Sequence, residues 1–390
     1  MNFAKQFLTW LCILCLGISS SAQTVIKKRA RDLGIPFDGI TGTNNAITDV
    51  PGIEVGYTTI IKDSGKLIAG KGPVRTGVTV ILPKGKKDEN YPAAWFSLNG
   101  DGEMTGIPYI EDYGMGYGPI GITNTNSVGI VKDAIGQWCF KKFSKGDFVD
   151  FSFGLPVAAE TWDGMLNDIN GFHIKMEHVW KALDSAKGGK IAEGNVGGGT
   201  GMVLYEFKGG SGTASRTFKI DTNTYTLGVF VQSNFGGRKE LTISGVPVGK
   251  EISGYEPVIH EPKRKDGSII VIIATDAPLM PLQLKQVAKR ATHGIARTGT
   301  YSHNSSGEIF LALSTAAPSY NKKMTEETWK VIPKWRMDPV YKAAVEATEE
   351  AIINTLVAAE DMEGINGNKV FALPQPLLID VMKKYNLLKK

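Results

Sequence analysis

An uninterrupted apolar run at residues 269–273 is the clearest structural signal in the chain. Five β-branched residues follow one another there, directly after Gly267, Ser268 and a charged, basic stretch at 261–266. A short run of this composition, bounded by turn residues, is typical of a fully buried strand. We therefore expect Ser268 at the first position of an interior strand, immediately after an exposed basic loop.

Strand-like and helix-like patterns alternate along the rest of the chain. Apolar runs bounded by turn residues predict further strands at 53–55, 77–83, 93–98, 120–123, 225–233 and 309–315. Apolar residues at helical spacing predict helices at 128–139, 162–170, 179–187, 281–296, 338–359 and 374–390. The Asn-Gly and Asp-Gly pairs at 99–102 predict a tight turn. This order predicts a layered α/β fold in which helices cover a sheet core.

The length of 390 residues allows either two domains or one large α/β unit. No internal repeat or low-complexity linker divides the chain. The composition is that of a globular protein, and a net charge of +5 is spread along the sequence. Apart from Lys263–Lys265 and the C-terminal lysines, no concentration of positive charge stands out, so we expect no nucleic-acid partner.

The first 22 residues have the pattern of a secretory signal peptide. Lys5 precedes an apolar stretch at 7–18, and Ser20, Ser21 and Ala22 offer small residues for cleavage before Gln23. The apolar stretch is short for a membrane span, although an uncleaved anchor is the alternative. We expect the mature protein to be exported, periplasmic or secreted, and to have no contact with a membrane after removal of the signal.

Cysteine and histidine usage argues against disulfides and metals. Cys139 is the one cysteine outside the predicted signal, so no internal disulfide is expected, and its aromatic neighbours indicate a small buried hydrophobe. The five histidines show no metal-ligand spacing. We expect no metal and no cofactor.

A glycine run from Gly194 to Gly201 suggests two interpretations. It could form a phosphate-binding loop, which would make the protein a non-catalytic ligand- or nucleotide-binding module. The Gly-Lys-Ser/Thr ending of such a loop is missing, however. The glycines are explained as well by backbone packed closely against backbone.

The Gly267–Ser268 pair also has two interpretations. The pair could simply close a turn, since glycine and serine are common turn residues. Alternatively, cleavage between them would leave Ser268 with a free α-amine, and such an N-terminal serine has a general base beside its own nucleophilic hydroxyl.

Long motifs throughout the chain decide between these interpretations. They stand in order at 31–36, 45–52, 95–100, 193–202, 266–271, 274–279, 296–299 and 306–312. With these motifs the chain resembles the L-aminopeptidase/D-esterase and β-peptidyl aminopeptidase family. The resemblance runs from about residue 29 to about 320, and this many motifs in one order is highly specific.

The resemblance implies a self-cleaving precursor with an αββα sandwich similar to that of N-terminal-nucleophile hydrolases. The cut would fall between Gly267 and Ser268, giving a first chain of residues 23–267 and a second chain of residues 268–390 within one large domain. Ser268 would then be the nucleophile of a serine aminopeptidase that acts through an acyl-enzyme. We also expect such two-chain units to associate into a homo-oligomer.

The same resemblance assigns the remaining site residues. Ser306 and Glu308 match the serine and acidic partners of the nucleophile, and Asn234 matches the oxyanion-hole asparagine. Glu160 matches the carboxylate that holds the free amine of the substrate. Trp162 stands where some members have tyrosine, which makes a tyrosine hydroxyl role doubtful here and favours the β-peptidyl members.

These residue types suit acyl transfer, which requires a nucleophile, a base and hydrogen-bond donors for the developing oxyanion. The base is either the α-amine of Ser268 or the Ser306 and Glu308 pair. Structural alternatives remain open: Ser306 could shape a turn, Glu308 could be a solvated carboxylate and Glu160 could cap a helix. The expected substrates are short peptides, amides or esters with a free α- or β-amino end, with hydrolysis or transfer to an amine as the outcome.

Overall fold

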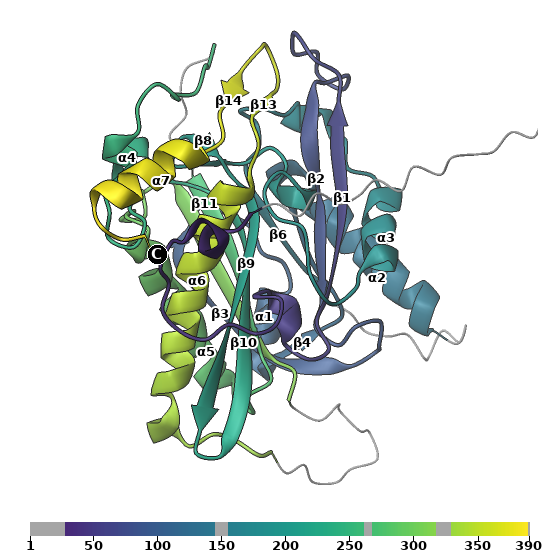
Figure 1. Cartoon of the computed structure of the whole chain (residues 1–390). Coiled ribbons are helices and arrows are strands. Elements are labelled where there is room, and N and C mark those ends of the chain that lie inside the picture. The colour runs from purple at the N-terminus through teal and green to yellow at the C-terminus, as the bar shows by residue number, and fades with distance from the viewer. Residues whose placement is uncertain (1–27, 145–154, 261–266, 317–328, 389–390) are drawn as a thin grey trace, which may run out of the picture.

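The structure is a computed structural model of the whole chain, which describes residues 28–144, 155–260, 267–316 and 329–388 (Figure 1). The predicted signal peptide, the basic stretch at 261–266 and the end of the predicted helix at 374–390 lie outside these ranges. Within the described ranges, no helix is both long enough and apolar enough to cross a membrane.

The larger of two main sheets has a parallel pair at its centre. Its strands are ordered β4 (Met115–Tyr117), β3 (Asn90–Gly100), β12 (Ser306–Ser314), β11 (Gly267–Thr275), β10 (Asn223–Asn234) and β9 (Gly210–Ile220). β11 and β12 are parallel, and α5 (Pro281–Arg297) makes the crossover that a parallel pair requires. Every residue of β11 after Gly267 is buried, as its unbroken apolar run predicts.

The smaller sheet has the order β1 (Glu54–Lys62), β2 (Val74–Leu82), β5 (Ile120–Asn124) and β6 (Val157–Thr161). Apolar side chains such as Ile122, Ile270 and Leu311 fill the space between the two sheets. α2 (Val128–Phe143) and α3 (Met176–Ser185) pack on the outer face of the smaller sheet. α5 and α6 (Asp338–Ala358) cover the larger one, so the layers follow an αββα order (Figure 1).

Short elements complete the described chain. The helices are α1 (Ile107–Tyr113), α4 (Val248–Glu251) and α7 (Gln375–Lys384), and two hairpins consist of β7 (Val203–Leu204) with β8 (Phe207–Lys208) and β13 (Met362–Glu363) with β14 (Lys369–Val370). Turns of 3-10 helix are η1 (Ala30–Leu33), η2 (Ile47–Asp49), η3 (Thr125–Ser127), η5 (Ile169–Gly171), η6 (Gly197–Gly199), η7 (Arg238–Glu240) and η8 (Lys334–Arg336).

The predicted strands are confirmed, and so are the predicted helices with one exception. The segment 162–170 is not an α-helix but a series of turns that ends in η5. Its polar side chains bond to another part of the chain instead of to its own backbone: Asn167 Oδ1 accepts a hydrogen bond from the amide of Arg75 in β2, and Asp168 Oδ2 accepts one from the amide of Gly70 in the loop before β2. Side chains of this kind compete with helix formation by satisfying backbone groups elsewhere. Cys139 is buried between the smaller sheet and its helices, as predicted.

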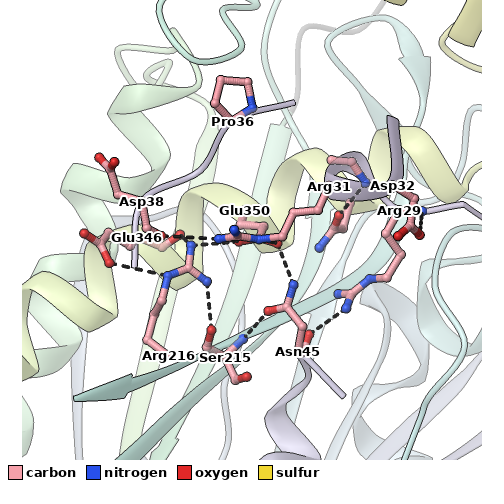
Figure 2. Close-up of polar contacts among 12 residues, drawn as sticks. Arg29, Arg31, Asp32, Pro36, Asp38, Asn45, Ser215, Arg216, Glu346 and Glu350 are labelled. Carbon is pink, nitrogen blue, oxygen red and sulfur yellow. Dashed lines mark hydrogen bonds and ion pairs between the residues drawn. The ribbon is translucent and has the colours of Figure 1, made fainter. Parts of the chain in front are cut away.

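A buried set of charges joins the N-terminal segment and β9 to α6 (Figure 2). We call Arg31, Arg216, Glu346 and Glu350 the α6 charge network. Arg31 makes two 2.8 Å contacts with Glu350, and Arg216 lies 2.7 Å from Glu350 and 3.4 Å from Glu346. Burial by itself raises the pKa of Glu350, but Arg31, Arg216 and Asn45 outweigh this effect and hold the pKa below its ordinary value.

Candidate active site

Ser268 lies at the buried start of β11, between two strands that supply its neighbours. It pairs with Asn234 at the end of β10 and with Gly307 of β12, and 5% of its surface is exposed. Gly267 pairs with Ser306. Three of the residues assigned from the sequence are therefore brought to one end of the larger sheet by strand register alone.

The Asn234 amide is held from both sides. Its Oδ1 accepts a hydrogen bond from the Val203 amide at 2.8 Å, and its Nδ2 donates to the Trp162 carbonyl at 2.9 Å. A side-chain amide nitrogen carries two hydrogens, so one hydrogen remains to be donated to another acceptor. Asn234 is 5% exposed, and such a fixed, nearly dry donor is the type that stabilises an oxyanion.

Ser306 and Glu308 project to the other face of the sheet from Ser268. Side chains alternate along a strand, and Phe310 of β12 belongs to the core under α5 and α6, whereas Ile270 of β11 belongs to the core between the sheets. Ser306 and Glu308 share the alternation of Phe310, and Ser268 shares that of Ile270. The two partners therefore approach the main chain at Gly267 and Ser268 rather than sharing a face with the Ser268 hydroxyl.

Glu308 is a buried carboxyl with incomplete hydrogen bonding. It is 1% exposed, so it is not a solvated loop residue. Burial raises its pKa, while the hydroxyls of Ser306 and Ser302 and the His303 ring oppose that rise. Glu308 Oε2 and the Ser306 hydroxyl each lack a hydrogen bond of ordinary geometry within the described part of the chain. Buried polar atoms left in this state are uncommon and call for an explanation.

Glu160 lies at the end of β6 and caps no helix. Its Oε1 accepts a hydrogen bond from the Glu103 amide at 3.0 Å, and its Oε2 accepts one from the Thr125 hydroxyl. Burial raises its pKa, and the negative charges of Glu103 and Asp101 add to the rise. A carboxylate offers about four acceptor positions. Glu160 therefore keeps the capacity to accept hydrogen bonds from a cation in an acidic environment.

Two glycines allow Glu160 and the Ser268 strand to approach each other. A Cβ on Gly102 would lie 3.2 Å from Glu160 Oε1 and 3.6 Å from the Gly307 Cα, and a Cβ on Gly307 would lie 2.3 Å from the Asp101 carbonyl oxygen. Gly307 is the residue paired with Ser268. Side chains at either glycine would push the anionic group away from the nucleophile.

A cavity of about 610 Å³ opens beside this end of the sheet. Trp162, Asn234, Gly267 and Ser306 all border it, together with Arg238 and His303. Ser268, Glu160 and Glu308 are not among its lining residues and lie behind them. The structure thus brings Asn234, Ser306 and Trp162 together on the cavity wall. Ser268 is paired with Asn234 but does not line the cavity, and neither do Glu308 and Glu160.

A family model described as peptidase family S58 matches residues 45–370. The chain belongs to peptidase family S58. The beta-peptidyl aminopeptidase BapA of Sphingosinicella microcystinivorans is 46% identical, and the match covers 98% of this chain and 99% of that protein. The protein of the same name from Sphingosinicella xenopeptidilytica is 44% identical over 96% of this chain and 95% of that protein.

Solved structures agree with this assignment. The L-aminopeptidase D-Ala-esterase/amidase of Ochrobactrum anthropi, whose structure is called a new variant among the Ntn hydrolase fold, is 42% identical with a TM-score of 0.85. The match covers 93% of this chain and 100% of that chain. The αββα layers of this S58 member are therefore those of an Ntn-type hydrolase, as the sequence motifs predicted.

The glycine run of this S58 member is packing and not a phosphate-binding loop. Gly197, Gly198 and Gly199 are buried, and the amides of Gly197 and Gly198 donate to the Thr59 and Thr79 hydroxyls. A Cβ on Gly198 would lie 2.6 Å from the Ile122 carbonyl oxygen. The interpretation as a nucleotide-binding module is therefore wrong, because the amides that would cradle phosphate already have partners.

Sequence reasoning missed several residues around the S58 site. Val203, which holds Asn234, contributes only its backbone, so no side chain marked it. Asp163 is completely buried next to Trp162, and His303 pairs with Glu240 at 2.8 Å on the cavity wall. Asp101 and Glu103 were interpreted only as part of a turn. Their placement beside Glu160 depends on the path of the chain after β3.

Proposed function

We propose that this S58 member is a self-processing serine aminopeptidase whose nucleophile is Ser268. The observation that carries the proposal is the register of β10, β11 and β12, which sets Ser268 beside an amide donor, Asn234, and near Ser306, whose hydroxyl lacks a hydrogen bond of ordinary geometry among the described residues. A nucleophile, an oxyanion donor and a polar partner are the groups that acyl transfer needs.

Maturation is one internal acyl transfer followed by hydrolysis. The Ser268 hydroxyl adds to the Gly267 carbonyl, the bond from that carbonyl carbon to the Ser268 nitrogen breaks, and an ester links the two residues. Water then cleaves the ester, leaving a Gly267 carboxylate and a Ser268 α-amine. The first chain would comprise residues 23–267 and the second chain residues 268–390.

Turnover uses the same groups on a substrate. The Ser268 hydroxyl attacks the scissile carbonyl, the leaving amine departs with a proton, and water hydrolyses the acyl-enzyme. The base is either the α-amine of Ser268 or the Ser306 and Glu308 pair. Because Ser306 and Glu308 lie on the opposite face from the Ser268 hydroxyl, their location favours a contact with the new α-amine, which they would orient.

Glu160 makes the enzyme require a substrate with a free amino terminus. A substrate ammonium would make a charge-assisted hydrogen bond with its carboxylate, which gives affinity and fixes the register of the substrate. The negative charges of Asp101 and Glu103 near Glu160 add to the attraction for a cation. The substrates are short peptides, amides or esters, as the names of the relatives support, and the half-buried Trp162 at the cavity mouth would contact their side chains.

Export and assembly complete the proposal. Residues 1–22 direct the precursor out of the cytoplasm and are cleaved off during export. The two-chain units then form a homo-oligomer. Size measurement of the purified mature protein and sequencing of its first chain test both statements, since a first chain that retains Met1 contradicts signal removal.

The deciding experiment is a denaturing gel of the purified protein with N-terminal sequencing of each band. We expect a second chain of 390 − 267 = 123 residues that begins at Ser268. Ser268→Ala should give one uncleaved and inactive chain. A wild-type protein that remains a single chain and is fully active would overturn the proposal.

A further inference from the structure

The orientation of the Asn234 amide depends on the Trp162 carbonyl. That carbonyl accepts one hydrogen of Asn234 Nδ2 at 2.9 Å and so determines where the other hydrogen points. What fixes the Trp162 carbonyl therefore fixes the oxyanion donor. The following inference rests on the oxyanion role proposed above for Asn234.

The Trp162 carbonyl belongs to the peptide unit that ends at the nitrogen of Asp163. Because a peptide unit is planar, its direction is set by the two Cα atoms that flank it and by the torsion angles there. Asp163 is 0% exposed, although its carboxyl is charged or strongly polar in either protonation state. A carboxyl is seldom buried so completely unless polar partners hold it.

Three separate segments supply those partners. Asn167 Nδ2 donates to Asp163 Oδ1 at 3.0 Å, and the side chains of Thr76 on β2 and Asn124 on β5 come close enough to lower the pKa of Asp163. Asn124 Nδ2 in turn donates to the Thr76 hydroxyl at 2.7 Å. The Asp163 carboxyl is thus bonded within its own turn and faces polar side chains of two strands of the smaller sheet.

The glycine run closes over this cluster. A Cβ on Gly201 would lie 2.9 Å from the Asp163 Cβ and 2.3 Å from the Arg75 carbonyl oxygen, so only glycine allows the chain to pass there. Gly201, the last residue of the glycine run, therefore serves to let the chain pass close to Asp163 and Arg75. This close approach of Gly201 limits the movement of Asp163.

We propose that Asp163 is a positioning residue for the acyl-transfer reaction: its carboxyl, bonded to Asn167 and enclosed by Thr76, Asn124 and Gly201, fixes the Trp162 carbonyl and thereby aims the Asn234 amide at the developing oxyanion. Asp163 touches neither the substrate nor the reacting atoms in this role. It acts entirely through Trp162 and Asn234.

The state of the carboxyl agrees with this role. Burial raises the pKa of Asp163 to about 7, although the polar groups of Thr76, Asn167 and Asn124 oppose that rise. Asp163 Oδ2 and Asn124 Oδ1, both acceptors, have no hydrogen-bond partner among the described residues. A protonated carboxyl is a donor as well as an acceptor, so the neutral form of Asp163 can satisfy both atoms.

The test compares kcat and KM for variants of Asp163. Asp163→Ala should lower kcat roughly 10- to 100-fold, since a misplacement of about 1 Å at a reacting centre can cost about 10²-fold. KM should stay the same, because the substrate contacts are untouched. Asp163→Asn keeps the shape, an acceptor for Asn167 and a donor, and should recover most of the lost kcat. Asp163→Ser, smaller but polar, provides a second variant without the carboxyl.

Asp168→Asn is the matched control. Asp168 lies in the same turn segment and is 2% exposed, but its carboxylate bonds to Gly70 and His173 and not to the cluster around Asp163. Its kcat should equal that of the wild type. Equal kcat losses in the Asp168 and Asp163 variants would show a general effect of disturbing the turn and would overturn the proposal.

A double-mutant cycle separates this inference from the proposed function. In an Asn234→Ala background, Asp163→Ala should cause no further loss of kcat, because coupled residues do not act additively. An additional full loss, or an unchanged kcat in a folded Asp163→Ala or Asp163→Ser single variant, would overturn the positioning role. An unchanged kcat in Asn234→Ala itself would instead overturn the oxyanion role of Asn234. All variants are compared after complete processing to two chains.

Discussion

The candidate active site and the α6 charge network both join residues before Gly267 to residues after Ser268, but they do so by opposite means. In the network each charged side chain faces an opposite charge, and Glu350 is contacted by two arginines (Figure 2). At the site, Ser306 and Glu308 keep unbonded polar atoms, and Asn234 keeps a hydrogen to donate.

This difference separates stability from function. A buried polar atom without a partner costs free energy, so a fold that only needed to be stable would fill such positions. The network approaches this state, since Arg216 Nε lies 3.4 Å from Glu346 although it has no hydrogen bond of ordinary geometry. The site leaves both the Ser306 hydroxyl and Glu308 Oε2 without such a bond and without an opposite charge of this kind, so they keep capacity for the reaction. The site also obtains its geometry from strand register and glycine contacts, which hold a donor in place without adding a formal charge beside the oxyanion.

The largest effect should come from removing the centre of the network. Glu350→Ala leaves Arg216, which is 1% exposed, with a weaker contact to Glu346, and breaking a buried pair in this way typically costs about 3–5 kcal/mol. Denaturant unfolding measures the loss. Folded protein should keep its kcat, because the network lies away from the cavity.

The control for that variant is Glu111→Ala. Glu111 and Lys285 also join the two segments, at 2.8 Å, but both are substantially exposed. Exposed pairs typically contribute roughly 0.2–1 kcal/mol. Equal destabilisation by the Glu350 and Glu111 variants would remove the distinction between buried and exposed contacts between the segments.

Next in size is the effect of Asn234→Ala on turnover. Losing one oxyanion donor costs about 10²–10³-fold in kcat, equivalent to about 2.7–4 kcal/mol of transition-state stabilisation. The free energy of unfolding should change less than in the Glu350 variant, since the Asn234 side chain makes two hydrogen bonds to backbone groups and carries no charge. Steady-state kinetics of processed protein measures the loss, and an undiminished kcat contradicts the assignment.

Glu160→Gln should change selectivity more than rate. Glutamine keeps the shape and an acceptor but removes the charge, so kcat/KM for free-amine substrates should fall by roughly tenfold or more, because charge-assisted bonds are about twice as strong as neutral ones. Substrates with an acetylated amine should be little affected. Matched free and acetylated p-nitroanilides on both proteins give the ratio, and an unchanged ratio would mean that Glu160 is structural.

The smallest expected effect is an acid-dependent loss of stability from Glu350. Its pKa in the folded protein lies below the unfolded value of about 4.3, so its contribution is complete above that pH and is lost as pH falls through the folded pKa. Wild type should therefore lose more stability than Glu350→Gln between pH 6 and pH 3.5. The free energy of unfolding of both proteins is measured at several pH values in this range. An equal loss in the two proteins would contradict the direction of the pKa shift.

The sequence by itself determined the elements with one-sided or unbroken apolar patterns. β11, α5 and α6 appear where the patterns predicted them, because burial of those residues dominates the local free energy. The motifs identified the family and located Ser268. Strands of weaker pattern were missed: β9, rich in glycine, serine and threonine, is buried through its pairing with β10 and its packing against α6.

Tertiary structure alone decided how the site is assembled. The segment 162–170 has helical spacing, yet Asn167 bonds to β2 and Asp168 to the loop before it. Long-range hydrogen bonds therefore replace a helix that would be only marginally stable alone. The opposite faces of Ser268 and Glu308, the hold of Val203 and Trp162 on Asn234 and the approach of Asp101 to Glu160 depend on contacts between distant strands. Local preferences extend over a few residues, whereas these contacts exist only after the two sheets have packed together.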